Sequence, residues 1–464
     1  MKTDQNFSPN LLIVFGRYPV PGRTKTRLIP ALGPAGAADF QRRLTETTVE
    51  TVTRFAKPHK IGVMVCFEGD SKKKMRRWIG ADAILSRQVP GSLGERMQAA
   101  FLDAFQRGTN RVVLLGTDIP QIKTDHLKQA FDALDKSDLV IGPSTDGGYW
   151  LVGMNHPVDL FKGIQWGTDA VFGQTVALAK KQGLRVKTLA PLNDVDTGED
   201  LKQVLPGWSG EKPYVSVVIP ALNEAANIEA AIERAMNEEA EIIVVDGGSV
   251  DNTVELASST GVRVVTGPRG RGMQQNLGAK TATGRVLLFV HADTLLPPGY
   301  VNYVFEILMD RKTVAGAFRF KTDLEHPSMK VIEFVTNIRS RYLKLPYGDQ
   351  GLFVRKSIFE SAGGFPEIPV AEDLVLLRRL LKYGRIGIAP AHALTSARRW
   401  QNLGIFRTTL INLMILIGCY VGVSPVTLAS MYRSKDKKPT KIPPNGMAGS
   451  SRVQGARRSR EKAV

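Results

Sequence analysis

Acidic residues stand where apolar runs of the sequence end. Asp246 and Asp293 each follow such a run, whereas Glu372 and Asp373 open a helical pattern. A carboxylate can hold Mg²⁺ or Mn²⁺ together with substrate phosphates, and a carboxylate can also take a proton from a reacting hydroxyl. We therefore interpret Asp293 as a metal ligand and Asp373 as a general base.

The residue types around them suit the release of a nucleoside diphosphate. Such a leaving group develops charge that a divalent cation and an arginine can offset, and Arg399 is the candidate arginine. Glu224, in a turn after another apolar run, can face a base or a ribose. Taken singly, each residue also fits a helix cap, a turn or a core pair. Their joint order favours a functional site.

The elements that must position these residues are buried strands. Apolar, β-branched runs alternate with helical patterns, which indicates a doubly wound α/β fold whose ligands bind beyond the carboxyl ends of the strands. The clearest runs are Leu11–Phe15, Ile61–Phe67, Val112–Leu115, Leu139–Ile141, Val215–Ile219, Ile242–Val245 and Val286–Val290.

The chain contains a loose internal repeat. Residues 112–120 and 287–297 both read as an apolar strand, an acidic residue and a proline turn. At 464 residues the chain is also too long for one ordinary core. We therefore predict two similar domains in tandem, at 10–207 and 213–403, with the boundary in the turn-rich stretch 205–210.

The C-terminal residues, taken in order, resemble glycosyltransferase family 2, which has the GT-A fold. The nearest subgroup is the one named for arsenosugar biosynthesis, also described as transferase two associated with radical-SAM/selenodomain proteins. The resemblance implies inverting transfer with a divalent metal, Mg²⁺ or Mn²⁺. The matching residues are Asn223-Glu224, Asp246, His291-Ala292-Asp293, Gly348-Asp349-Gln350, Glu372-Asp373 and Arg399-Trp400.

This resemblance assigns roles within the site. It implies that Asp293 binds the metal and that Asp373 is the base, and we place Glu372 and Arg399 with Asp373 as catalytic residues. The residues expected to bind the nucleotide are Glu224, Asp246, Arg271 and Asn276, and those expected near the acceptor are Gly348, Asp349, Gln350 and Trp400. The usual acidic-x-acidic metal motif of the family reads His291-Ala292-Asp293 here, so His291 is free to hydrogen-bond a phosphate.

A second candidate site follows the first strand of the N-terminal half. The loop 16–28 contains Gly, Pro and the basic residues Arg23, Lys25 and Arg27, a composition that can bind phosphates without being a Walker loop. Asp118 and Asp196 could jointly hold one Mg²⁺ over a triphosphate. The alternatives are a solvated basic loop and, around Asp196, a turn with a helix cap.

The N-terminal half resembles the family described as radical-SAM/selenodomain-associated transferase one, a nucleotidyltransferase-like GT-A family similar to guanylyltransferases. It lacks the pyrophosphorylase fingerprint Gly-x-Gly-x-Arg-Met. The fusion predicts that one half makes or handles an activated sugar and that the other transfers it. The alternatives are a nucleotidyltransferase whose C-terminal half only binds nucleotide sugar, a second glycosyltransferase in the N-terminal half, and a carotenoid- or lipid-directed glycosyltransferase at the membrane.

Charge and composition narrow the partners. The net charge is +18, of which residues 433–464 supply +8, with ten Lys/Arg against two acids. We expect this basic tail to be disordered. A basic balance favours nucleotides or anionic lipid, and no aromatic-interleaved basic stripe points to nucleic acid. With two cysteines in apolar runs, Cys66 and Cys419, we expect a cytoplasmic protein.

An apolar segment at 404–432 precedes the tail. Its core run, 410–423, has a length typical of a buried or interfacial helix rather than of a membrane span. Packing against the domain, lying in the membrane interface and spanning the membrane all stay open, in that order of preference. The basic tail would favour peripheral contact with the inner face of the membrane.

Overall fold

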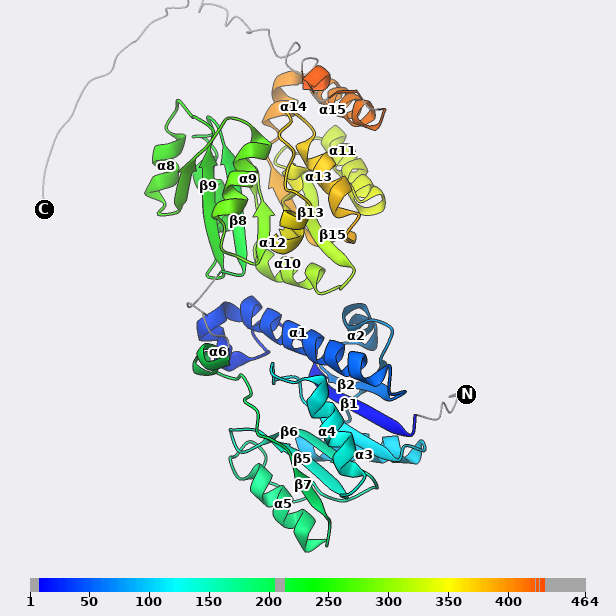
Figure 1. The fold of residues 1–464 in the computed structure, drawn as a ribbon. Coiled ribbons are helices and arrows are strands. Elements are labelled where there is room, and N and C mark those ends of the chain that lie inside the picture. The colour runs from blue at the N-terminus through cyan, green and yellow to red at the C-terminus, as the bar shows by residue number, and fades with distance from the viewer. Residues whose placement is uncertain (1–7, 205–212, 422, 425, 430–464) are drawn as a thin grey trace, which may run out of the picture.

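The computed structural model describes residues 8–204, 213–421, 423–424 and 426–429. They form two α/β domains in sequence order, each built around its own twisted sheet (Figure 1). This confirms the predicted architecture of tandem domains. The predicted boundary stretch 205–210 and the predicted disordered tail 433–464 lie outside the described residues.

The first sheet has seven strands in the order β3-β2-β1-β4-β6-β5-β7. β6 runs antiparallel to both neighbours, and the other neighbouring pairs are parallel. The strands are β1 (Asn10–Arg17), β2 (Gly62–Glu68), β3 (Ile84–Arg87), β4 (Arg111–Leu115), β5 (Leu139–Pro143), β6 (Tyr149–Met154) and β7 (Val186–Thr188).

The helices of this domain are α1 (Ile29–Ala56), α2 (Lys72–Ile79), α3 (Leu93–Gln106), α4 (Thr124–Leu134), α5 (Val171–Lys181) and α6 (Gly198–Val204), with the short 3₁₀ turn η1 (Thr26–Leu28). Gly33 breaks α1 near its start, with φ of 70° and ψ of 168°, and Pro34 begins the regular part. α1 lies on the side of the domain that faces the second domain (Figure 1).

The second sheet repeats this plan with one added edge strand, in the order β10-β9-β8-β11-β14-β13-β15-β12. β14 is antiparallel to both neighbours, as β6 is in the first sheet. This shared order, with one reversed strand, is the GT-A arrangement. The strands are β8 (Val215–Ala221), β9 (Ala240–Asp246), β10 (Arg263–Thr266), β11 (Val286–Phe289), β12 (Thr294–Leu295), β13 (Thr313–Thr322), β14 (Leu352–Arg355) and β15 (Arg385–Thr395).

The helices of the second domain are α7 (Ile228–Ala235), α8 (Thr253–Ser259), α9 (Arg271–Thr281), α10 (Tyr300–Leu308), α11 (Pro327–Ile338), α12 (Lys356–Ser361), α13 (Glu372–Leu380), α14 (Arg398–Leu403) and α15 (Ile405–Tyr420). A π-helical turn, η2 (Arg339–Leu343), continues α11, and a 3₁₀ turn, η3 (Gly348–Gln350), precedes β14. Among the described helices, none is long and apolar enough to cross a membrane.

The central strands are buried on both faces, which is why their sequences read as unbroken apolar runs. In β1, Leu11 to Val14 are fully buried, and in β8 every residue is buried. Each of the seven predicted runs lies in a strand to within one residue, whereas β3, β6, β7, β10 and β12–β15 were not predicted. Most of the missed strands are short, whereas β13 and β15 are long strands whose apolar residues are interrupted by glycine, proline or charged residues.

Polar contacts join the two domains at the start of α1. The Glu239 carboxylate of the second domain accepts hydrogen bonds from the backbone N–H groups of Ala35 and Gly36, at 2.5 and 3.0 Å. A carboxylate is favourable at a helix N-terminus because it satisfies donors that lack a partner within the helix. Arg285 of the second domain also lies 3.9 Å from the buried Asp39 of α1.

Candidate functional site

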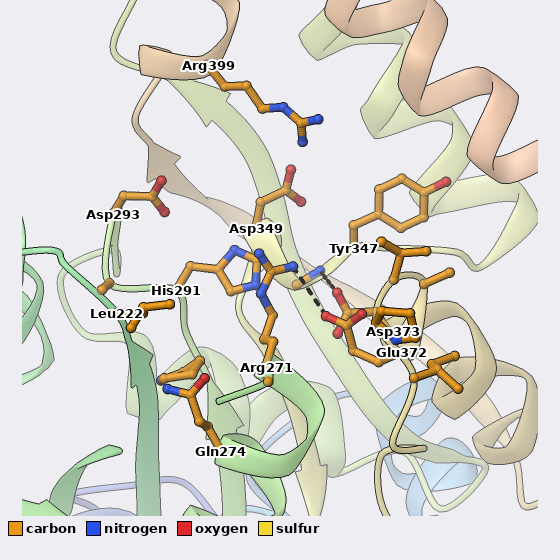
Figure 2. Close-up of a pocket in the computed structure, with 18 of the residues that line it drawn as sticks. Leu222, Arg271, Gln274, His291, Asp293, Tyr347, Asp349, Glu372, Asp373 and Arg399 are labelled. Carbon is orange, nitrogen blue, oxygen red and sulfur yellow. Dashed lines mark hydrogen bonds and ion pairs between the residues drawn. The ribbon is translucent and has the colours of Figure 1, made fainter. Parts of the chain in front are cut away.

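A cavity of about 850 Å³ opens beyond the carboxyl ends of β8 and β11. The start of α9, the turn η3, the start of α13 and one face of α15 complete its wall. The position agrees with the rule that ligands of open α/β sheets bind beyond the carboxyl ends of the strands. Figure 2 shows acidic and basic side chains that face one another across this space.

Three aspartates lie along the cavity: Asp293, Asp349 and Asp373 (Figure 2). Burial raises the pKa of Asp373 to about 7, with a further contribution from the neighbouring Glu372 carboxylate. Burial likewise raises the pKa of Asp349 to about 6. Burial, together with the Glu224 carboxylate, raises the pKa of Asp293. The cavity thus concentrates carboxylates that are costly to ionise without a cation nearby.

The two carboxylate oxygens of Asp373 differ in their hydrogen bonding. Its Oδ2 accepts a hydrogen bond from the Gly348 backbone N–H at 2.9 Å, whereas its buried Oδ1 has no hydrogen-bond partner. Asp373 lies in the first turn of α13, where the helix dipole favours a negative charge. Ala371, just before this helix, adopts φ of 65°, a left-handed conformation that is uncommon for a non-glycine residue.

His291 meets Asp373 at the backbone of Gly348. A Cβ added to Gly348 would lie 2.6 Å from both His291 Nε2 and Asp373 Oδ2, so glycine permits this close approach. Burial holds the pKa of His291 well below its usual value, and the imidazole is therefore neutral. Its Nε2 is buried without a hydrogen-bond partner.

Two arginines face the carboxylates from opposite walls. Arg271, the first residue of α9, forms an ion pair with Glu372 at 3.2 Å, and half of its side chain stays exposed. Arg399 extends from α14 toward Asp349 (Figure 2). Guanidinium groups so placed can bind phosphate oxygens by charge-assisted hydrogen bonds.

Of the predicted nucleotide-binding residues, Glu224 and Arg271 line the cavity. The Glu224 carboxylate accepts two hydrogen bonds from Arg398, at 2.9 and 3.1 Å, and one from Asn227. Asp246 does not line the cavity. Its carboxylate accepts hydrogen bonds from the N–H groups of Gly248 and Ser249, so it shapes the loop after β9.

Two other predicted site residues hold backbone instead of facing the cavity. Asn276 makes a pair of hydrogen bonds with the backbone of Phe365, both at 2.9 Å. Gln350, predicted near the acceptor, is fully buried. Its side-chain amide accepts a hydrogen bond from the Ser340 hydroxyl and donates one to the carbonyl oxygen of Phe318. The remaining predicted acceptor residues, Gly348, Asp349 and Trp400, do line the cavity.

The N-terminal domain has a smaller pocket, of about 390 Å³, at the matching end of its sheet. All five predicted residues line it, namely Arg23, Lys25, Arg27, Asp118 and Asp196. Two further arginines, Arg17 and Arg96, take part in its wall and pair with Glu68 at 3.0 and 2.8 Å.

Lys25 lies between the two acids of this pocket. Its Nζ is 3.0 Å from Asp118 Oδ1 and 2.6 Å from Asp196 Oδ1, and it also donates to the carbonyl oxygen of Val195. Burial opposes the charge of Lys25, but the two carboxylates outweigh burial and raise its pKa. Within the described ranges, no three His, Cys, Asp or Glu side chains converge as a metal cluster.

Sequence reasoning missed several contacts that shape the two sites. It took Lys25 as a phosphate ligand without its ion pairs, and it gave no role to Arg398, which forms an ion pair with Glu224. Tyr347, stacked on Arg339 at 3.7 Å, also lines the cavity and was not predicted. The Arg398-Arg399 pair was a usable signal, because adjacent residues at the start of a helix point in different directions.

In a comparison with known proteins, each half of the chain matches a different family model. Residues 216–363 match the family described as glycosyl transferase family 2. Residues 51–168 match a family described as an uncharacterized protein conserved in bacteria, DUF2064.

Individual relatives agree with the C-terminal match. A dolichol-phosphate mannosyltransferase of Pyrococcus furiosus is 32% identical over 116 residues, which are 23% of this chain and 33% of that protein. The probable glycosyltransferase YdaM of Bacillus subtilis is 27% identical over 210 residues, 39% of this chain and 50% of that protein. The chain thus spans a third to a half of the length of these curated relatives.

Among solved structures, a protein from Desulfovibrio desulfuricans G20 described as a nucleotide-diphospho-sugar transferase is similar to this chain. The two are 34% identical, and the match covers 44% of this chain and 90% of that chain with a TM-score of 0.40.

Proposed function

We propose that the cavity of the C-terminal domain, whose residues 216–363 match glycosyl transferase family 2, transfers a sugar from a nucleoside-diphosphate sugar to an acceptor hydroxyl. One observation carries the proposal: Asp373, with its free oxygen and its pKa near 7, shares a cavity with Asp293. A proton acceptor and a cation ligand are the two groups that direct displacement at a sugar carbon requires.

Asp373 is the proposed general base. A base is most effective when its pKa lies near the working pH, and burial brings the pKa of Asp373 to about 7. The Gly348 N–H fixes Oδ2, so Oδ1 is the atom that takes the acceptor proton. The acceptor oxygen then attacks the sugar carbon from the side opposite the diphosphate, which would invert the configuration at that carbon.

Asp293 is the proposed ligand of a divalent cation, Mg²⁺ or Mn²⁺. The residues fit such an ion, because Asp293 is a hard oxygen donor whose burial and acidic neighbour make an uncompensated negative charge unfavourable. When bound, the cation would neutralise charge on the diphosphate. Arg399 and Arg271, which face the same space, would hold the phosphate oxygens.

The test uses the full chain with UDP-, GDP-, ADP- and TDP-sugars, each with Mn²⁺ or Mg²⁺. We expect at least one sugar nucleotide to raise the melting temperature in a metal-dependent way and to lose its diphosphate slowly to water or to an added acceptor. Asp373→Asn should keep the thermal shift and lose the release. No thermal shift with any donor, or undiminished release by Asp373→Asn, would contradict the proposal.

For the N-terminal half, we propose that the basic pocket binds the phosphates of a nucleotide or of an activated sugar. Four arginines and Lys25 around one pocket favour this function over a merely solvated loop, because Lys25 is buried and fixed by ion pairs. A nucleotidyl transfer there would release pyrophosphate from a nucleoside triphosphate and a sugar 1-phosphate. If the full chain released no pyrophosphate with any pair of nucleoside triphosphate and sugar 1-phosphate, the pocket would have a binding role only.

A further inference from the structure

An exposed apolar surface lies on the C-terminal domain beside the cavity, and we propose that it docks this protein onto an anionic lipid bilayer. We call it the α11–α15 surface, because α11 with its continuation η2 supplies one part and α15 supplies the other. Its exposed apolar residues are Val331, Phe334, Val335, Ile338, Tyr342, Leu343, Phe406, Leu410, Leu413, Met414, Ile417 and Val421.

α11 presents its apolar stripe to solvent. Val331, Phe334, Val335 and Ile338 recur at the spacing of one helix face, and Phe334 is 66% exposed. The side of α11 that faces the domain contains the buried Met329 and two polar side chains that hold it to β13. The Glu333 carboxylate accepts from the backbone N–H and hydroxyl of Thr322, and Asn337 bonds the backbone of Phe320 at 2.8 and 3.0 Å. α11 therefore differs from the usual surface helix, because most of its apolar residues face solvent and not the core.

α15 carries a second outward stripe. Phe406, Leu410, Leu413 and Ile417 lie on one face, and Phe406 is 86% exposed. The other face of α15 supplies Asn412, Ile415 and Leu416 to the wall of the cavity. A helix is about 10 Å across, so the exposed stripe lies only that far from the cavity.

The two stripes belong to one surface. Ile332 of α11 and Ile405 of α15 pack against the same buried cluster, which contains Trp400 and Phe320. Figure 1 shows the two helices next to each other at the end of the domain that is remote from the first domain. An exposed apolar area built from two helices exceeds the scattered single residues that are normal on protein surfaces.

The charges around the surface select the partner. Lys330, Arg341 and Arg407 are exposed on the same helices, and Lys344 ends the π-helical turn. Residues 327–344 contain a single acidic residue, Glu333, and its side chain hydrogen-bonds β13. Residues 405–420 contain no acidic residue. The sequence then continues into residues 433–464, with ten Lys/Arg and two acids. Apolar stripes rimmed by positive charge match acyl chains beneath anionic headgroups.

A second copy of this chain is a poorer occupant. In a symmetric dimer through this surface, the cationic rim of one copy would face the cationic rim of the other, and like charges destabilise such an interface. A bilayer containing phosphatidylglycerol offers the complementary charge. This inference does not rest on the proposed glycosyl transfer, because it uses only the outer face of the two helices.

The test is co-sedimentation of the full chain with vesicles of phosphatidylcholine alone and of phosphatidylcholine mixed with phosphatidylglycerol. We expect binding to the mixed vesicles, with much weaker binding to the neutral ones. The double variant Phe334→Glu with Phe406→Glu should reduce the partition coefficient on mixed vesicles by roughly tenfold or more, because two exposed apolar side chains that would insert into the bilayer become charged.

The matched control is Met236→Glu with Leu102→Glu, which adds the same charge at exposed apolar residues elsewhere. The control should bind within about twofold of the wild type, given that single exposed apolar residues contribute little. Equal binding by both double variants would overturn the proposal and assign vesicle binding to the basic tail. Absence of binding to mixed vesicles would also overturn it. So would light scattering that shows a dimer of the wild type and a monomer of the Phe334/Phe406 variant.

Discussion

The two halves of this chain share one sheet order, but they handle negative charge at equivalent positions in opposite ways. An aspartate follows the fourth strand of each sheet: Asp118 after β4 and Asp293 after β11. In the first domain, the loop after β1 delivers Lys25 to Asp118. In the second domain, the loop after β8 delivers Glu224, whose charge adds to the effect of burial in raising the pKa of Asp293.

This difference distinguishes the positions of the site residues, which the fold determines, from the charge of the site, which the loop residues determine. The fold places an acid and a loop side chain at the same end of each sheet, as expected for open α/β sheets. The sign of the loop side chain then sets the ligand chemistry. A pocket whose acids are already paired with a lysine favours an anionic ligand, whereas a cavity with several unpaired carboxylates favours a cation bound together with phosphates.

The largest expected effect comes from removing the aspartate after the fourth strand of each sheet. Asp293→Asn should lower the rate of sugar transfer by about 100-fold or more, since the proposed cation stabilises the leaving diphosphate by several kcal/mol. Asp118→Asn should leave transfer from a supplied sugar nucleotide within about twofold of the wild type, because Asp118 lies in the other domain. Steady-state rates at saturating donor and metal measure both.

The comparison would fail if both variants lost transfer equally, because the two pockets would then act as one site. Titration of Mn²⁺ sharpens the result. Asp293→Asn should raise the metal concentration required for half-maximal rate, whereas Asp118→Asn should not.

A second prediction contrasts one glycine of each domain. Gly348→Ala would put a Cβ 2.6 Å from Asp373 Oδ2 and His291 Nε2, which must displace the proposed base. We expect kcat to fall by roughly tenfold to 100-fold, as misplacement of a catalytic group by about 1 Å does elsewhere. Gly116→Ala, after β4, meets open space and should change kcat little. Equal kcat for the two variants would argue against a catalytic position for Asp373.

The positions of the strongest site residues could be predicted because they follow directly from the strand pattern. Buried parallel strands read as apolar runs, and their carboxyl ends locate Asp118 and Asp293 without knowledge of the tertiary structure. Asp373 could be predicted from its place at the start of a helix, together with the family resemblance. The doubly wound α/β architecture followed from the same runs, whereas the GT-A fold was implied by the family resemblance. About half of the strands were not recognised, because they are short or because glycine, proline and charged residues interrupt their apolar pattern.

What could not be predicted depends on contacts between distant residues. Lys25 meets Asp196 across 171 positions, and no local pattern encodes that ion pair. Asp246 and Gln350 have the residue types of ligand-binding groups, and their hydrogen bonds to nearby backbone and to buried polar groups could not be predicted from the sequence. The outward stripe of α11 shows the same limit, because amphipathic spacing gives two faces without saying which one is covered.

A third prediction concerns the pH dependence of transfer. Asp373 must be ionised to accept a proton, and its pKa is raised to about 7. The rate should therefore increase about tenfold per pH unit well below pH 7 and level off above it. The N-terminal pocket should differ, because the raised pKa of Lys25 keeps its charge throughout this range. The profile of kcat/KM between pH 5 and 9 reports the ionisation of Asp373, and phosphate binding over the same range reports the charge of Lys25. A rate that did not vary with pH would exclude Asp373 as the base.

The smallest expected effect is on stability, and it has opposite signs in the two domains. The folded-state pKa of Asp373 is raised from 3.8 to about 7, so this group favours the folded state below pH 3.8 and loses that contribution as the pH rises through 7. Asp373→Asn should therefore stabilise the protein at pH 8 by about 1 to 2 kcal/mol and bring no gain at pH 4.

Asp196→Asn removes one of two carboxylates around Lys25, and at 41% exposure of its side chain that pair should contribute less than about 1 kcal/mol. This variant should lower the melting temperature slightly at pH 8, where Asp373→Asn raises it. Calorimetric melting at pH 4 and pH 8 separates the two cases. A decrease for both variants at pH 8 would mean that the Asp373 carboxylate already has a compensating cation. The contrast between a lysine-paired pocket and an unpaired carboxylate cavity would then be wrong.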